Sequence, residues 1–466
     1  MNVFLFRILN ALSRFILVIF SVATLSSCDE FVTVDLPTSQ LSGPTVFEDV
    51  ATADAALGYI YAKLRDEVLL QGNSSGVGCL MGHYADELDY YSSGNLAPQF
   101  FYQNNVLPTN GTIRTLWNGT YQLVYAANAV IEGVQQSSSL SVADKERLLG
   151  EALFLRAYLH FYLVNMFGEI PYVISTDYVT NASISKSTVQ DVYSSISTDL
   201  QQSATLIPTT YVSFERTRPN KSVVYALLAR VKLYSEDWSQ AIQYADLVIG
   251  STSMYQLAPV DNVFLKESTG TLLQLRPQFT GANTLEAQNY TFTSAPPPTF
   301  ALTPALVSSF EVGDIRRTNW IQTVTNGVDS WYHAYKYKAI GTTGSSVEYS
   351  ILLRLEELYL IRAEAKVQML DLTGGAADLN VIRNRSGLGD TPFSNQPDLL
   401  DAIHQERRHE FFTELGHRWF DLKRSGTATS VLGVVKPGWD TKDLLLPLPE
   451  SELLLNPNLM PQNLGY

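Results

Sequence analysis

The sequence contains few cysteines, few histidines and few charged residues. Of its 466 residues only two are cysteines, Cys28 and Cys79, and six are histidines. This excludes a fold held together by several disulfides and a cysteine-rich zinc site. Charged residues make up 17% of the chain, with 32 basic against 46 acidic side chains and a formal net charge of -14. Because nucleic-acid binding depends on neutralising phosphates with Lys and Arg, no nucleic-acid partner is expected.

Apolar and aromatic residues, in contrast, are plentiful. Hydrophobic residues make up 45% of the chain, which includes 25 Tyr and 21 Phe. This composition supports a large buried core and excludes an intrinsically disordered chain. A chain of this length corresponds to roughly two to three ordinary domains, or to one array of helices that grows by stacking.

The N-terminus carries the features of an export signal. Two arginines precede an apolar run at residues 15–25, which is shorter than the ~20 residues a membrane-spanning helix needs and suits the core of a signal peptide. The run ends in Leu25-Ser26-Ser27-Cys28, which resembles the lipobox of bacterial lipoproteins. This resemblance implies a cleaved signal peptide, residues 1–27, and lipidation of Cys28. A short membrane anchor, or a buried helix with a chance cysteine, is the alternative.

Apolar residues recur at intervals of three and four over much of the chain, the period of a helix with one buried face. Ala53, Leu57, Ile60 and Leu64 illustrate this period near the start of the chain. The fold class is therefore predicted to be mostly α. Helices are predicted at residues 50–70, 113–134, 146–167, 188–206, 222–235, 240–249, 354–369, 375–385 and 399–414.

Two segments lack this period. Residues 72–108 are aromatic and acidic, and we expect a long, irregular and exposed segment there. Residues 256–350 are rich in Gly, Pro and Thr, which predicts a loop-and-strand insertion carried by a helical scaffold.

Charged residues of both signs alternate near residues 406–424, which at first suggests acid–base chemistry. Opposite charges at helical spacing more often form structural ion pairs, and we favour that interpretation for Glu406, Arg407, Arg408, Glu410, Arg418, Asp421, Lys423 and Arg424. The sequence His409-Glu410-Phe411-Phe412-Thr413 begins like a zinc-protease helix but lacks the second histidine. No metal site and no cofactor are predicted.

Several motifs follow one another along the chain without forming a repeat. In the N-terminal half they are Trp117 with Tyr121 and Asn128, Gly150-Glu-Ala-Leu-Phe-Leu-Arg-Ala-Tyr158, Phe167-Gly-Glu-Ile-Pro171, and Leu227-Leu-Ala-Arg-Val231 with Trp238 and Ala241. In the C-terminal part they are Arg354-Leu-Glu-Glu-Leu358, Leu379-Asn-Val-Ile-Arg-Asn-Arg-Ser-Gly387, Glu406-Arg-Arg-His-Glu410, Gly416-His-Arg-Trp-Phe-Asp-Leu-Lys-Arg424, Leu446-Pro-Leu-Pro-Glu450 and Gln462-Asn-Leu-Gly-Tyr466. In this order they resemble the SusD/RagB family of outer-membrane nutrient-binding lipoproteins, over nearly the whole mature chain.

The resemblance implies an architecture as well as a location. It implies a tetratricopeptide-like helical-repeat scaffold of about eight helices in four pairs, with an irregular loop and short-strand insertion that binds ligand. The expected regions are a lipidated tether at 28–48, an N-terminal helical region at 49–255, a variable insertion at 256–349 and a C-terminal helical region at 350–466. The expected location is the cell outer membrane, where an acyl chain on Cys28 anchors the protein in the lipid and the body is exposed at the surface.

Two groups of residues are candidates for ligand binding. Sugars present apolar C–H faces and polar rims, so proteins bind them with aromatic rings beside amides, carboxylates or arginine. The first group is Asp86, Tyr90, Tyr91, Asn95, Phe101 and Tyr102, and the second is Arg276, Phe279, Asn289 and Tyr290. For each of these residues the alternative is a role in fixing its loop to the core. Trp320, Trp331, Tyr332 and Tyr335 are expected mostly in the core.

The resemblance implies that the protein captures a nutrient, in the first instance an oligosaccharide, and delivers it to a SusC-like TonB-dependent transporter without catalysing a reaction. A peptide-binding member of the same uptake system is the main alternative. A further alternative is a surface glycosidase that uses Asp86 and Asp89, because two carboxylates about 5–10 Å apart could hydrolyse a glycosidic bond. The last alternative is a structural adaptor built on helical repeats.

Overall fold

The computed structural model describes residues 43–466 apart from 95 and 214. The predicted signal peptide, Cys28 and most of the tether therefore lie outside the described residues, as does Asn95. The chain divides into residues 1–46 and 47–466. Of the first part, a short helix α2 (Gly43–Val46) is described, and the following paragraphs concern the second part by itself.

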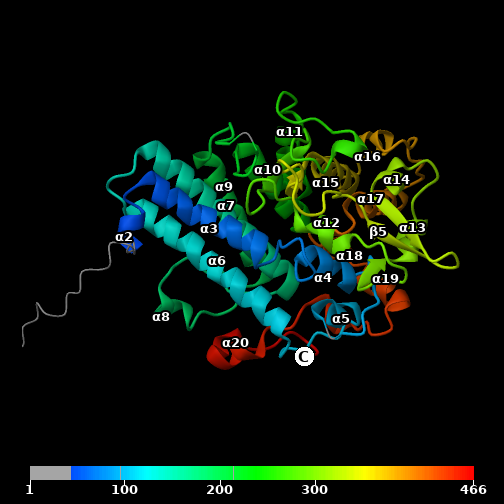
Figure 1. Ribbon diagram of the computed structural model, residues 1–466. Coiled ribbons are helices and arrows are strands. Elements are labelled where there is room, and N and C mark those ends of the chain that lie inside the picture. The colour runs from blue at the N-terminus through cyan, green and yellow to red at the C-terminus, as the bar shows by residue number, and fades with distance from the viewer. Residues whose placement is uncertain (1–42, 95, 214) are drawn as a thin grey trace, which may run out of the picture. The chain divides into compact units, whose positions relative to one another are not determined.

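Residues 47–466 are mostly helical, which confirms the predicted fold class (Figure 1). The helices of more than ten residues are α3 (Val50–Asp66), α6 (Gly111–Gln136), α7 (Val142–Phe167), α9 (Val189–Leu206), α10 (Lys221–Tyr234), α11 (Trp238–Ile249), α15 (Leu355–Gln368), α16 (Leu372–Arg385) and α17 (Gln396–Phe411). Each corresponds to a helix predicted from apolar spacing.

Shorter helices connect these elements. The α-helices are α4 (Val77–Tyr84), α5 (Ala97–Tyr102), α8 (Tyr178–Asn181), α12 (Leu285–Tyr290), α13 (Pro304–Ser308), α14 (Ile315–Asn319), α18 (His417–Arg424), α19 (Ala428–Val435) and α20 (Glu450–Leu455). The 3-10 helices are η2 (Val260–Asn262), η3 (Thr441–Leu444) and η4 (Pro457–Leu459).

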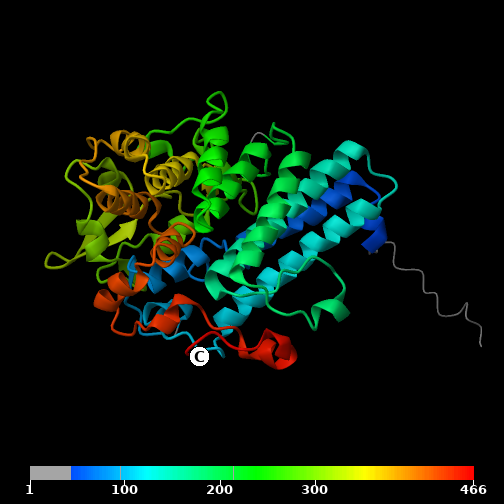
Figure 2. The same cartoon turned by 180° about the vertical axis from the view of Figure 1, so that it is seen from behind.

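The four long N-terminal helices α3, α6, α7 and α9 lie side by side, as the two opposite views in Figures 1 and 2 show. Asp49 caps α3 by accepting hydrogen bonds from two backbone amides of its first turn, and the predicted apolar stripe of this helix is buried. The central helix α7 packs against both α6 and α9. From Gly150 onward α7 is buried on every side, so it contributes more of the core than the single stripe predicted from its sequence.

A second set of helices contains the pairs α10 with α11 and α15 with α16, and α11 packs on α15. Ala229 of α10 and Ala241 of α11 are fully buried. The assignment of these pairs to tetratricopeptide-like units stays a prediction.

Six short strands form two antiparallel sheets. They are β1 (Leu88–Tyr90), β2 (Thr271–Leu275), β3 (Phe300–Leu302), β4 (Ile321–Thr325), β5 (Ser330–Ala334) and β6 (Ser350–Arg354). One sheet has the order β1-β3-β5-β4, and β2 pairs with β6. Tyr90 lies opposite Phe300, and Leu302 lies opposite Tyr332. Strands in the predicted insertion thus pair with a strand near residue 90, far away in sequence.

The prediction that residues 72–108 form a long, irregular and exposed segment is wrong. The segment contains the helices α4 and α5, and nearly all of α4 is buried. A helix that is covered on all sides has no polar face and therefore no alternation of apolar and polar residues, so its sequence gives no amphipathic signal. The segment also supplies strand β1.

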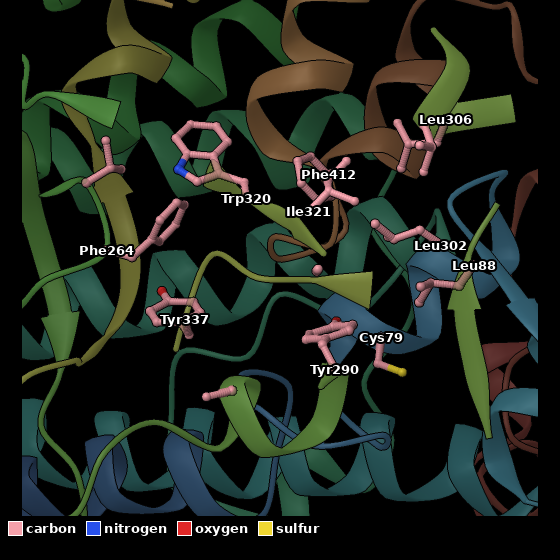
Figure 3. Close-up of a cluster of buried hydrophobic side chains, with 14 of the residues drawn as sticks. Cys79, Leu88, Phe264, Tyr290, Leu302, Leu306, Trp320, Ile321, Tyr337 and Phe412 are labelled. Carbon is pink, nitrogen blue, oxygen red and sulfur yellow. The ribbon is translucent and has the colours of Figure 1, made fainter. Parts of the chain in front are cut away.

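A hydrophobic cluster joins the helical body to the strands (Figure 3). Cys79 of α4 and Leu88 of β1 lie in it together with Trp320, Tyr337 and Phe412. Residues of the predicted N-terminal, insertion and C-terminal regions therefore share one core. The region boundaries at 256 and 350 stay predictions.

The charged residues near 406–424 mostly form buried ion pairs, as the alternation of signs predicts. Arg316 is buried and contacts Glu406 at 2.6 Å and Glu410 at 2.9 Å. Glu410 also contacts Arg354 at 2.5 Å and Arg385 at 2.6 Å. These contacts connect α14, β6, α16 and α17. Lys423 is an exception, because in the described part of the chain it forms no ion pair.

Candidate functional site

Aromatic side chains gather where strand β1 meets the rest of its sheet. Tyr91 directly follows β1, and its backbone amide donates to the carbonyl of Thr299 at 2.7 Å. Tyr91 is 41% exposed, and the partly exposed side chain of Trp331 on β5 lies near the Tyr91 hydroxyl. Tyr90 and Tyr102 are partly exposed rings with centroids 6.4 Å apart.

A cavity of about 330 Å³ opens beside Tyr102 and strand β1. Asp89 of β1, Tyr102 of α5 and Lys436 after α19 line it. Further lining residues are Ala85, Asp86, Leu88, Thr303, Pro304, Ala305 and Val435. The cavity volume falls at the lower end of the range of about 300–1,000 Å³ that is common for ligand sites.

Asp89 is an unpaired acidic residue that lines this cavity. Within the described residues its carboxylate has no hydrogen-bond or ion-pair partner. Burial raises the pKa of Asp89, and the positive charge of Lys436 offsets part of this rise. Burial, followed by the charge of Asp89 and the neighbouring Tyr91, raises the pKa of Tyr102. A carboxylate without a partner, beside aromatic rings, can accept hydrogen bonds from ligand hydroxyls.

Lys436 supports the floor of the cavity. Its ammonium donates to the backbone carbonyl of Tyr102 at 2.8 Å and to that of His83, and lies 4.4 Å from the centre of the Tyr102 ring. Burial lowers the pKa of Lys436 to about 7, and the charges of Asp89 and Asp86 offset part of this decrease. The lysine thus fixes the position of Tyr102.

Asp86 lies at the cavity but is occupied by arginines. Its carboxylate accepts from Arg418 at 2.7 and 2.9 Å and from Arg408 at 2.8 Å. Burial raises the pKa of Asp86, but the neighbouring Arg418 and Arg408 lower it by more than burial raises it. The pKa of Asp86 is therefore below its usual value. This carboxylate therefore stays ionised and links α17 and α18 to the segment before β1.

The other predicted ligand residues occupy different settings. Phe101 has no exposed side-chain surface and packs on Tyr84 with ring centroids 5.9 Å apart. Tyr290 is buried in the hydrophobic cluster, where its hydroxyl donates to the carbonyl of Thr413 at 3.4 Å. Asn289 lies near the buried thiol of Cys79, and its side-chain nitrogen has no hydrogen-bond partner among the described residues. In this structure these three side chains support the core.

Arg276 and Phe279 lie apart from the first group. The side chain of Arg276 is 60% exposed with its guanidinium 3.9 Å from Glu215, and Phe279 is 56% exposed. Phe279 lines a cavity of about 190 Å³ together with Arg65 and Gln288. Arg276 and Phe279 are therefore the two residues of the second predicted group whose side chains are exposed to solvent.

Sequence reasoning missed Trp331 and Lys436. Trp331 was expected mostly in the core because it alternates with polar residues like a strand residue, and it does lie on a strand. Strand β5 lies between β3 and β4, and only the pairing of β1 with β3 and of β3 with β5 brings Trp331 into the same sheet as the strand that precedes Tyr91. Lys436 belongs to no motif, and no sequence signal identifies it.

The described residues contain no group of three or more His, Cys, Asp or Glu side chains that could hold a metal ion. None of the described helices has the length and apolar character required to cross a membrane.

Comparison with known proteins agrees with this architecture. A family model described as "Starch-binding associating with outer membrane" matches residues 77–233, and the model of the SusD family matches residues 303–466. SusD-like protein P2 of Formosa agariphila is 27% identical, over 95% of this chain and 97% of its own length. SusD-like protein P38 of the same organism is 24% identical over 97% and 98% of the two chains.

Solved structures show the same fold. A SusD superfamily protein from Bacteroides vulgatus superposes with a TM-score of 0.78 at 20% identity, covering 90% of this chain and 99% of that one. A laminarin-binding SusD-like protein superposes with a TM-score of 0.74 at 22% identity, covering 89% and 99%. Together with the two family models, these similarities over almost the full length show that the chain belongs to the SusD/RagB family.

Proposed function

We propose that this protein is a cell-surface lipoprotein that binds an oligosaccharide and delivers it to a SusC-like TonB-dependent transporter. The observation that carries the proposal is the combination of two aromatic rings, the exposed Tyr91 and the partly exposed Trp331, with the unpaired carboxylate of Asp89 at a cavity. Aromatic faces bind the apolar faces of sugar rings, and a carboxylate accepts from their hydroxyls. A structural neighbour that binds laminarin supports a glycan ligand.

The proposed site has three parts. Tyr91 and Trp331 form the platform on which a sugar ring lies. Asp89 accepts hydrogen bonds from sugar hydroxyls, while Tyr102 lines the cavity and Tyr90 lies against Tyr102. Asn95 stays a proposed contact from the same segment, and Asp86 supports the site through its two arginines. Arg276 and Phe279 are proposed to bind a more distant part of an extended chain.

The proposed protein is a binder and not an enzyme. A glycosidase needs one carboxyl group as acid and a second carboxylate as base or nucleophile. Asp86 is committed to Arg408 and Arg418, which supports a structural role for this carboxylate. The proposal therefore predicts ligand recovery without cleavage.

The proposal is tested by a ligand-binding screen and by measuring the affinity of three single-residue variants. The purified full-length protein is screened in parallel against laminarin oligosaccharides, other neutral glycans and a peptide library. We expect glycan binding that falls at least 10-fold in Tyr91→Ala and in Trp331→Ala, because loss of a stacked ring removes about 1–2 kcal/mol or more. Tyr178→Ala is the matched control, since Tyr178 on α8 is 79% exposed and does not line the cavity. Binding of peptides alone, or equal affinity in all three variants, contradicts the proposal.

A further inference from the structure

A larger cavity lies away from the proposed glycan site. Its volume is about 640 Å³, and it is bounded by α7, α9, α10, α18 and the C-terminal tail. None of its lining residues lines the cavity of Asp89. The volume suits a small molecule, since ligand cavities usually measure about 300–1,000 Å³.

One of the two lysines that line this cavity, Lys423, has no acidic partner among the described residues. The ammonium of Lys423 donates to the backbone carbonyl of Asn165 at 2.6 Å. An ammonium has three N–H donors, so further donors remain for a ligand. In the described part of the chain no carboxylate lies within ion-pair distance of it, whereas the next residue, Arg424, contacts both Glu364 and Asp421. Burial lowers the pKa of Lys423 to about 7.

None of the other charged or titratable groups that line the cavity forms an ion pair with Lys423. Glu169, which is 53% exposed, faces Lys186 at 3.7 Å, and Lys186 also donates to the carbonyl of Pro461 at 2.7 Å. The other titratable side chains that line the cavity are Tyr193, Tyr234 and the paired Arg424. The cavity is therefore locally positive within a chain of formal net charge -14.

The rest of the wall suits an apolar ligand body. Val164, Val189, Leu445 and Leu464 contribute aliphatic surface. Several polar side chains of the wall already have partners within the protein. Tyr193 donates to Asn165 at 2.9 Å, Gln462 bonds the backbone of Leu448, and Asn463 donates to the carbonyls of Phe167 and Leu446. Few groups remain to bind the many hydroxyls of a sugar.

We propose that this cavity is a second binding site, specific for a small carboxylate with an apolar body, whose carboxylate pairs with the ammonium of Lys423. The charge-assisted hydrogen bond supplies the selectivity for an acid, and the aliphatic and tyrosine walls bind the body. The site is independent of the glycan site, because the two cavities share no residue.

The first test compares two probes that differ in charge alone. Indole-3-acetate and its neutral amide, indole-3-acetamide, are titrated calorimetrically into the full-length protein in detergent, with the signal from detergent alone subtracted. The acid is expected to bind at least 10-fold more tightly than the amide at pH 6. Equal affinity of the two probes, or no binding of the acid, overturns the proposal.

The second test uses variants and pH. Lys423→Met is expected to lower the affinity for the acid at least 10-fold and to leave the amide unaffected, while Lys423→Arg retains much of the affinity. Lys221→Met, at the start of α10, is the matched control. Because the free lysine loses its proton above about pH 7, affinity for the acid should weaken between pH 7 and pH 9. If the Met variant does not fold, the pH profile of the unmodified protein still decides: a flat profile overturns the proposal.

Discussion

Asp86 and Asp89 show how the surroundings of a side chain determine what it can do. Both are carboxylates near strand β1, yet Asp86 is held by Arg408 and Arg418 whereas Asp89 has no partner in the described residues. The first is consequently a structural ion, and the second is available to a ligand. The proposed glycan site therefore depends on Asp89.

Asp89→Asn is expected to weaken glycan binding about 10-fold at pH 7, because an amide is a poorer acceptor for sugar hydroxyls than a carboxylate. The fold should be unaffected, since the carboxylate has no internal partner to lose. Calorimetric titration of the glycan identified in the screen measures the change. Asp261→Asn, an exposed change in η2, serves as the control, and an unchanged affinity in Asp89→Asn removes this residue from the site.

Glu87 gives a prediction about pH. Burial raises its pKa from 4.5 to about 7, although the amide of Thr413 donates to it at 3.1 Å. Between pH 4.5 and about pH 7 the Glu87 carboxyl group is protonated in the folded state and has lost its proton in the unfolded state. The stability that this protonation contributes is therefore fully present below pH 4.5 and is lost as the pH rises through about 7.

Glu87→Gln removes this proton equilibrium. The free energy of unfolding of the variant, relative to the natural protein, should rise by roughly 1–3 kcal/mol from pH 5 to pH 8. Urea unfolding at both pH values measures the difference. Glu267→Gln, with a side chain 72% exposed, should show no such trend. A constant difference between the natural protein and Glu87→Gln at the two pH values contradicts the prediction.

At the scale of elements, a polar junction holds three long helices together. Arg156 of α7 bonds Asp199 of α9 at 2.6 and 2.7 Å and Asn128 of α6 at 2.9 Å. Tyr172 also donates to Asp199 at 2.6 Å. The junction lies among the buried faces of these helices, so each polar group depends on the others for its hydrogen bonds.

Asp199→Asn is expected to lower the free energy of unfolding by about 3–5 kcal/mol, because it leaves the guanidinium of Arg156 buried without a counter-charge. Asp246→Asn is the contrast: its carboxylate also bonds an arginine, Arg362, but is 53% exposed. Loss of such an exposed pair costs at most about 1 kcal/mol. Chemical unfolding of both variants gives the comparison, and equal losses contradict the assigned role of the junction.

A helix with one apolar face could be predicted from its sequence, as α3 shows with its four buried residues. Helix α4 could not be predicted, since it is buried nearly all round and has no periodic contrast. For a related reason, only part of the candidate site could be predicted from the sequence. Tyr90, Tyr91 and Tyr102 stand close in sequence, but Trp331 joins them only through the pairing of β1, β3 and β5. Long-range strand pairing leaves no local signal.

At the scale of the whole molecule, the proposed anchor places the acidic, helical body at the cell surface. Cys28→Ala is expected to release the protein from the outer membrane, because the thiol that carries the acyl chain is lost. Membrane fractionation of cells, with globomycin treatment in parallel to block signal cleavage, measures attachment. Cys79→Ala is the control, because Cys79 is buried and free. Unchanged attachment of the Cys28 variant contradicts the proposed lipidation.

The central claim is that a glycan lies on Tyr91 and Trp331 with its hydroxyls on Asp89. The most direct test is a crystal structure of the protein with the tightest-binding oligosaccharide from the screen. The account predicts a sugar ring against the two aromatic side chains and hydroxyl groups within about 3 Å of the Asp89 carboxylate. A sugar bound only elsewhere, for example beside Phe279, with the surface of Tyr91 and Trp331 left free, would contradict it.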